Sequence, residues 1–303
     1  MGKSFKNVGS RLILTLAAAL TLVLMTAFPT KAASKPSPIT ELKQIDDSST
    51  SVEVSWSCLG GSDTRYKVEV SEQPSTGYIV VEENAYSTSE YITGLSAGKT
   101  YYVRVTPFVE DDDTDQIIWG DTSAPVKVVT APDKAPATIT HTKSTTDSIT
   151  VNWSAVPGAD VYQVVYSQSG TANEFTKETT GTSVTLKNLS KDARYTIKVR
   201  AGKKYTDGTG RAWGNYHTKY DVPVKSTKVE GIKVSGYYQN LSKISITNKA
   251  KACADGYQYQ LYTAYKGQDK ETKVKSITVN QNNPGSSNQV SASMKISALK
   301  NHN

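Results

Sequence analysis

Residues 94–105 read Gly-Leu-Ser-Ala-Gly-Lys-Thr-Tyr-Tyr-Val-Arg-Val, and residues 188–199 repeat the plan as Asn-Leu-Ser-Lys-Asp-Ala-Arg-Tyr-Thr-Ile-Lys-Val. In both copies a Tyr follows the Leu by six residues and opens an alternation of apolar and polar side chains. A third copy begins at Ser297-Ala298-Leu299, shortly before Asn303. A fixed period near one hundred residues indicates repeated domains. The break in the third copy favours a longer parent protein.

Short runs of alternating apolar and polar residues dominate the chain beyond its first segment. Such runs, separated by clusters of Gly, Pro, Ser and Asp, are typical of short antiparallel strands. The strands predicted in this way span residues 51–58, 66–70, 101–105, 126–129, 149–153, 162–166 and 195–199. Because no stretch of ten or more residues shows helical apolar spacing, we predict an all-β fold, either a sandwich or a barrel.

Two features of the repeat resemble fibronectin type III domains. One is a Trp in an early strand of each copy, Trp56 and Trp153, and the other is the Leu-to-Tyr step. The resemblance implies tandem immunoglobulin-like antiparallel β-sandwiches, in which a Tyr at the corner into strand F bonds to the backbone upstream. The residues assigned to the structural core are Trp56, Trp153, Leu95, Leu189, Tyr101 and Tyr195.

The prolines and the repeat set the expected domain boundaries. We expect domains over residues 38–132 and 133–225 and an incomplete domain over residues 226–303, with strands F and G missing. In the third unit Asn248 stands where the Trp would be, and we expect this unit to fold poorly. The linkers at residues 131–136 and 226–231 are short, so the units should stack as a semi-extended rod.

The first 32 residues have the composition of a secretory signal peptide. Lys3, Lys6 and Arg11 precede an apolar run from Leu12 to about Phe28, and small residues follow near Ala32. We therefore predict cleavage after Ala32, a secreted or cell-surface-associated location, and no membrane span in the mature chain. An uncleaved N-terminal anchor is the alternative, because a run of roughly this length can cross a bilayer.

Charge is segregated along the chain. Residues 38–132 hold six basic and sixteen acidic residues, residues 133–225 hold thirteen and eight, and residues 226–303 hold eleven and four. Such asymmetry steers association. An exported chain makes nucleic acid a poor partner, whereas an anionic cell-wall polymer suits the basic end. Solvated lysine-rich faces are the simpler explanation.

Neither the cysteines nor the histidines indicate catalysis. Cys58 and Cys253 lie in different repeats, and we expect both thiols to be free. The histidines, His141, His217 and His302, show no metal-ligand spacing, and there is no phosphate-binding loop. We predict that these residues form no enzyme and bind no cofactor.

Two loops carry candidate contact residues. Asp111, Asp113 and Asp115 lie in an acidic run that is a weak candidate for Ca²⁺, although a solvated acidic turn explains it more simply. The aromatic residues of the second group are presented near the F–G hairpins, where they suit stacking on sugars or on a protein partner. This group consists of Trp119, Trp213, Tyr205 and Tyr216. Cross-strand packing is the alternative role for these rings.

These observations predict a secreted or surface protein that binds, adheres and acts as a spacer without catalysis. Its partner would be an extracellular protein or a polysaccharide or other cell-wall polymer. Two alternatives stay open: the N-terminal accessory part of a secreted carbohydrate-active enzyme, and a purely structural stalk.

Overall fold

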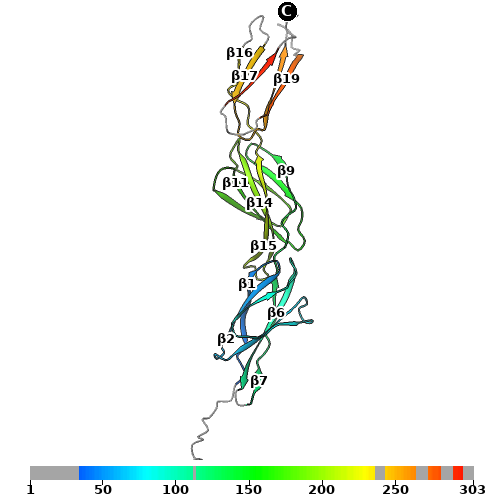
Figure 1. Cartoon of the computed structure of the whole chain (residues 1–303), viewed down its shortest axis with the longest axis vertical. Coiled ribbons are helices and arrows are strands. Elements are labelled where there is room, and N and C mark those ends of the chain that lie inside the picture. The colour runs from blue at the N-terminus through cyan, green and yellow to red at the C-terminus, as the bar shows by residue number, and fades with distance from the viewer. Residues whose placement is uncertain (1–33, 112–113, 236–242, 264–271, 281–288, 296–303) are drawn as a thin grey trace, which may run out of the picture.

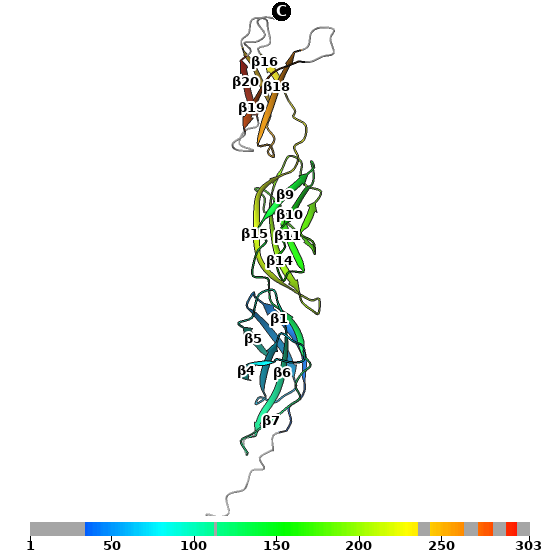
Figure 2. The same cartoon turned by 90° about the vertical axis from the view of Figure 1, so that its right-hand side faces the viewer.

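The computed structural model describes residues 34–111, 114–235, 243–263, 272–280 and 289–295. This part of the chain contains twenty strands and no helix. Three all-β modules follow one another end to end and form an extended rod, as both views show (Figure 1, Figure 2). The predicted signal peptide and the third Leu-bearing copy at Leu299 lie outside the described residues.

Domain 1 is a sandwich of two antiparallel sheets. One sheet has the order β1-β2-β5, and the other has the order β4-β3-β6-β7 with β8 also paired to β6. Because β7 pairs with the far half of β6 and β8 with its near half, two short strands share one edge. The strands are β1 (Ile39–Asp47), β2 (Ser51–Cys58), β3 (Arg65–Ser71), β4 (Ile79–Ala85), β5 (Ser89–Thr93), β6 (Thr100–Asp111), β7 (Gln116–Trp119) and β8 (Val126–Val129).

Domain 2 repeats this plan with a single long final strand. Its sheets have the orders β13-β10-β9 and β12-β11-β14-β15. The strands are β9 (Ile139–Ser144), β10 (Ile149–Trp153), β11 (Val161–Gln168), β12 (Glu174–Thr179), β13 (Ser183–Leu186), β14 (Arg194–Lys204) and β15 (Arg211–Pro223). The two predicted repeats are therefore tandem antiparallel sandwiches, which confirms the fold class.

The third module contains counterparts of β9 to β13 within its described residues. Its sheets have the orders β16-β17-β20 and β18-β19. The strands are β16 (Lys233–Ser235), β17 (Lys243–Lys249), β18 (Gly256–Thr263), β19 (Thr272–Asn280) and β20 (Gln289–Lys295). Its apolar core centres on Ile244, Ile246 and Met294.

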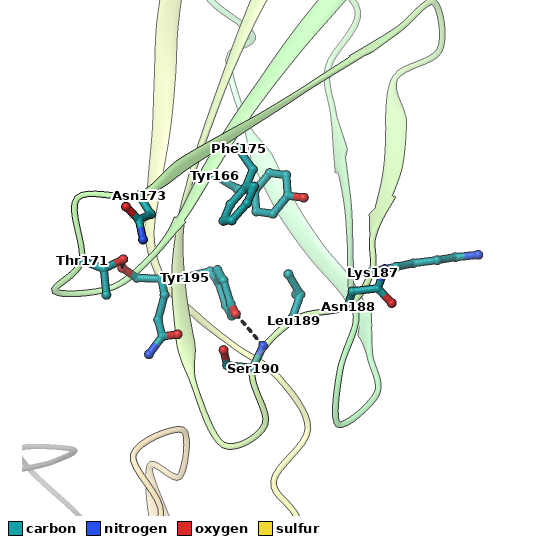
Figure 3. A pocket seen from close by; sticks show the side chains of 10 residues that line it. Tyr166, Thr171, Asn173, Phe175, Lys187, Asn188, Leu189, Ser190 and Tyr195 are labelled. Atoms are coloured by element: carbon teal, nitrogen blue, oxygen red, sulfur yellow. Dashed lines mark hydrogen bonds between the residues drawn. The ribbon is translucent and has the colours of Figure 1, made fainter.

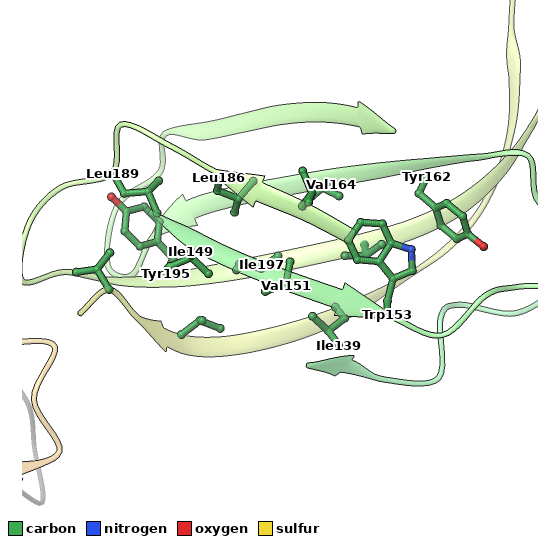
Figure 4. Packing of buried hydrophobic residues seen from close by; sticks show 14 of the residues in the cluster. Ile139, Ile149, Val151, Trp153, Tyr162, Val164, Leu186, Leu189, Tyr195 and Ile197 are labelled. Atoms are coloured by element: carbon green, nitrogen blue, oxygen red, sulfur yellow. The ribbon is translucent and has the colours of Figure 1, made fainter. Parts of the chain in front are cut away.

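Period-two alternation places one face of the central strands β2, β10 and β14 in the core. In domain 2 the buried residues of β10 and β14 face one another, and the Trp153 ring lies against Tyr162 at 5.6 Å between ring centroids (Figure 4). Domain 1 has the same arrangement, with Trp56 and Tyr66 at 5.2 Å. Both Trp side chains are buried, so each sandwich is organised around one indole ring.

The corner into strand F is fixed by a tyrosine hydroxyl. The backbone N–H of Ser96 donates to the Tyr101 hydroxyl at 2.8 Å, and that of Ser190 donates to the Tyr195 hydroxyl at 2.7 Å. Each hydroxyl satisfies a backbone group of the loop between the two sheets, which would otherwise be left partly buried and unpaired. The Leu-to-Tyr step in the sequence contains this bond, which begins at the Ser that follows the Leu.

A second tyrosine hydrogen bond occurs at the same place in domain 2 and in the third module. The Val156 N–H donates to the Tyr162 hydroxyl at 2.9 Å, and the Lys251 N–H donates to the Tyr257 hydroxyl at 2.5 Å. Asn248, at the expected Trp position, is buried, and its side-chain oxygen accepts from the Tyr259 hydroxyl. The third module thus replaces an indole with a polar pair.

Replacing Trp153 by Ala should destabilise domain 2 by about 3–5 kcal/mol, because it removes a buried ring and leaves a cavity. Trp153→Phe should cost less, since the indole Nε1 has no hydrogen-bond partner in the described structure. Urea unfolding of the two variants measures both changes. A loss below about 1 kcal/mol for Trp153→Ala would contradict this packing.

Candidate binding surfaces

The outer face of the β4-β3-β6-β7 sheet in domain 1 carries stacked cations and aromatic rings. The Trp119 ring lies 4.8 Å from the Phe108 ring, and the Lys67 Nζ lies 5.1 Å from the Trp119 centroid. Arg65 lies over Phe108 at 5.4 Å and pairs with the Glu110 carboxylate. Trp119 keeps 44% of its surface exposed, so the top of this stack is open to a partner.

The corresponding face of domain 2 repeats the stack with different residues. The Arg200 guanidinium lies 4.7 Å from the centroids of both the Trp213 and Tyr216 rings. Its Nε donates to the Gln163 side-chain oxygen at 2.9 Å, and the Tyr216 hydroxyl donates to the same oxygen at 2.6 Å. Cation–π contacts of this kind contribute about 0.5–1 kcal/mol each at exposed sites.

Three of the four predicted contact aromatics therefore lie on outer sheet faces, one in domain 1 and two in domain 2. They pack against neighbouring strands, as the cross-strand alternative expects, and they also keep exposed surface. Sequence analysis missed the cations between them, Arg65, Lys67 and Arg200. The sequence does carry a signal for these cations, because basic residues recur at alternate positions in or beside the predicted strands at residues 66–70 and 195–199.

Tyr205 lies elsewhere, in the junction between domains 1 and 2. Its hydroxyl donates to the Asp47 carboxylate, and its ring joins a buried cluster with Val129, Ala131 and Ala212. The hydroxyl of the next residue, Thr206, donates to the backbone oxygen of Lys127 at 3.2 Å. The F–G hairpin of domain 2 is thus anchored on domain 1.

Burial at this junction raises the pKa of both Asp47 and Tyr205. Desolvation raises the pKa of the Asp47 carboxyl, although the hydrogen bond from Tyr205 opposes this rise. Desolvation and the Asp47 hydrogen bond together raise the pKa of the Tyr205 hydroxyl. The tyrosine therefore keeps its proton and remains the donor to Asp47.

The backbones of domains 1 and 2 also approach each other closely at this junction. Gly98 and Gly158 both have positive φ, and a Cβ built on Gly158 would lie 2.5 Å from the Gly98 oxygen. The linker is also tied to domain 1, since Gly98 N–H donates to Ala131 O and Ala131 N–H donates to Ser48 O, each at 2.9 Å. The chain leaves domain 1 along a fixed path.

The junction between domain 2 and the third module is polar. The Asp192 carboxylate accepts from the Thr227 N–H at 2.8 Å, the Thr227 hydroxyl at 2.6 Å and the Lys251 Nζ at 3.0 Å. Arg194 donates to the backbone oxygens of Ala252 and Cys253 at 3.1 and 3.2 Å. Cys253 is buried against the core of domain 2, and both cysteines are unpaired.

The described residues of the acidic run lie at a turn before β7. The Asp111 Oδ1 accepts from the Thr114 N–H at 3.1 Å and from the Thr114 hydroxyl at 3.0 Å, and Asp115 has a φ of 52°. Asp113 lies outside the described residues. Across the described parts of the chain, no three His, Cys, Asp or Glu residues are grouped closely enough to hold a metal ion.

The family model for the fibronectin type III domain matches residues 36–127 and 134–214, more than half of the chain. The chain belongs to the fibronectin type III domain family. Within its described residues, the structure has no helix long and apolar enough to cross a membrane.

Among the curated proteins similar to this chain are a collagen chain and a phage tail tube protein. The chain is 28% identical over 246 residues to the collagen alpha-1(XII) chain of Notophthalmus viridescens, covering 80% of this chain and 25% of the relative. It is 42% identical over 67 residues to the tail tube protein gp17.1* of Bacillus phage SPP1, covering 22% and 24% respectively. The chain spans about a quarter of the length of each relative.

Among solved structures, a segment of two fibronectin type III domains from chicken tenascin has 20% sequence identity and a TM-score of 0.31. The match covers 61% of this chain and 98% of that segment.

The Asp192 carboxyl should titrate well below its ordinary value of 3.8. Burial opposes ionisation, but hydrogen bonds from Thr227 and Lys251 outweigh it and lower the pKa to about 2. The stability contributed by this group is therefore present above pH 4 and lost as the pH falls toward 2. Carboxyl NMR shifts measure the titration directly.

Asp192→Asn removes the charge of this carboxylate and tests its contribution to stability. The free energy of unfolding should fall by about 1 kcal/mol at neutral pH, after allowance for solvent screening. Near pH 2 the same substitution should lower it by much less, because Asp192 is then largely protonated. An equal loss at both values of pH would contradict an ionised Asp192 at this junction.

Proposed function

We propose that this protein is an extracellular, non-catalytic spacer that also binds a partner through the faces of its sandwiches. The signal-like first 32 residues support export. The similarity to a collagen chain over most of the described rod supports an extracellular setting. The partner is an extracellular protein or a polysaccharide of the cell wall or matrix.

The single observation that carries the spacer role is the close junction between domains 1 and 2. Tyr205 contacts Asp47 from the F–G hairpin, while Gly98 and Gly158 meet backbone to backbone. A linker of this kind fixes both the distance and the angle between neighbouring domains. Domains joined only by a flexible tether make no such contacts.

The binding role is supported by the exposed stacks on the outer faces of both sandwiches. Trp119 in domain 1 and Trp213 with Tyr216 in domain 2 present rings that neighbouring cations already hold in place. Rings fixed in this way lose little side-chain entropy on binding. Trp, Tyr and Arg are also the residues that contribute most binding energy at interfaces.

The double variant Trp119→Ala, Trp213→Ala separates a binding protein from a plain stalk. We expect retention on cell-wall polysaccharide or matrix-protein surfaces to fall roughly tenfold or more, with only about 1–2 kcal/mol of stability lost from the cation–π stacks. Tyr91→Ala is the matched control, because Tyr91 is 57% exposed on β5, in the opposite sheet of domain 1.

Unchanged retention in the double variant, with the control also unchanged, would contradict the binding role. The protein would then act as a stalk. Urea unfolding of all three proteins shows that each variant is folded during the retention assay.

A further inference from the structure

Domain 2 has a hollow of about 430 Å³ on a side of the sandwich that its second sheet leaves open. Its wall comes from β11, from β12 and from the residues between β13 and β14. Figure 3 shows Tyr166 and Phe175 on one side of the hollow, facing Leu189 and Tyr195, with polar side chains at both ends. The site is separate from the cation–aromatic stacks described above.

Two aromatic rings form the floor of the hollow. Tyr166 and Phe175 are cross-strand partners in β11 and β12, with ring centroids 5.5 Å apart and planes 27° apart. Tyr166 follows Tyr162 and Val164 on the core-facing side of β11, but no residue of β12 is buried. Phe175 is therefore 56% exposed on the inner side of its sheet.

Unpaired polar groups surround these rings. The side-chain amides of Gln168, Asn173 and Asn188 make no hydrogen bond within the described part of the chain, although all three line the hollow. Ser190 lines it as well, the Lys187 side chain extends away from it (Figure 3), and no acidic residue lines it. Amides offer both donors and acceptors. The rim is thus equipped for a neutral ligand that has many hydroxyl groups.

The size and chemistry of the hollow fit a sugar. One face of a pyranose ring presents C–H groups with partial positive charge, which pack against the negative face of an aromatic ring. Its hydroxyl groups need partners that donate and accept, and the three amides supply them. We propose that the hollow binds a pyranose unit of a glycan, stacked on Phe175 and hydrogen-bonded by Gln168, Asn173 and Asn188.

Domain 1 shows that the fold itself does not require these groups. At the equivalent cross-strand position it has Val70 opposite Ile79, with no aromatic ring. Glu72 takes the place of Gln168 and is paired with Lys99 at 2.7 Å, while Gly94 takes the place of Asn188. The aromatic floor and the unpaired amides are therefore particular to domain 2, which provides a matched control within one chain.

The proposal is tested by saturation-transfer NMR and titration calorimetry on the whole chain, with cellotriose, chitotriose and mannotriose as probes. We expect transfer to at least one trisaccharide. Phe175→Ile, which installs the domain 1 residue, should weaken that binding roughly tenfold or more. Asn188→Gly should weaken it several-fold. Tyr220→Ala should not, because Tyr220 is exposed on β15 and does not line the hollow.

Absence of transfer to all three trisaccharides, or equal affinity of the wild type and Phe175→Ile, would overturn the proposal. The Trp119→Ala, Trp213→Ala protein should keep its trisaccharide affinity, because those rings lie on the outer sheet faces. Failure of this site and failure of the outer-face binding role are therefore distinguishable in the same set of variants.

Discussion

The backbone contact between Gly98 and Gly158 is the constraint on which the extended shape of this protein depends. Gly158 has no space for a Cβ, a Cβ on Gly98 would be in tight contact with Gly158, and both residues have positive φ. At the same junction the Gly98 N–H donates to the Ala131 carbonyl at the start of the linker, and the Tyr205 hydroxyl donates to Asp47. Domain 2 is thereby held against domain 1 by backbone geometry and is secured by one partly buried tyrosine.

A fixed junction gives the surfaces of the rod a defined relation to one another. The outer faces of domains 1 and 2 present their aromatic rings at set positions. The hollow of domain 2 that we propose as a sugar site lies on a different side. The acidic first domain and the more basic second domain add a charge gradient along the same axis. A rod built in this way displays several surfaces without depending on a flexible linker.

Sequence patterns predicted the sandwich because its causes are local and periodic. The alternation in β2, β10 and β14 and the six-residue spacing to Tyr101 and Tyr195 are written along single strands. The position of Tyr205 was not predictable in this way, since its burial depends on Asp47, which is 158 residues away. Phe175 was missed for a related reason: its exposure depends on how far the opposite sheet extends over β12, and no periodicity encodes that distance.

The central claim is that domains 1 and 2 move as one body. Residual dipolar couplings, measured for both domains of the whole chain in one aligned sample, test it directly. The structure predicts that one alignment tensor fits both domains, and that Tyr205→Ala makes the two tensors differ in magnitude. Different tensors for the two domains of the wild-type protein would show independent motion and would contradict the account.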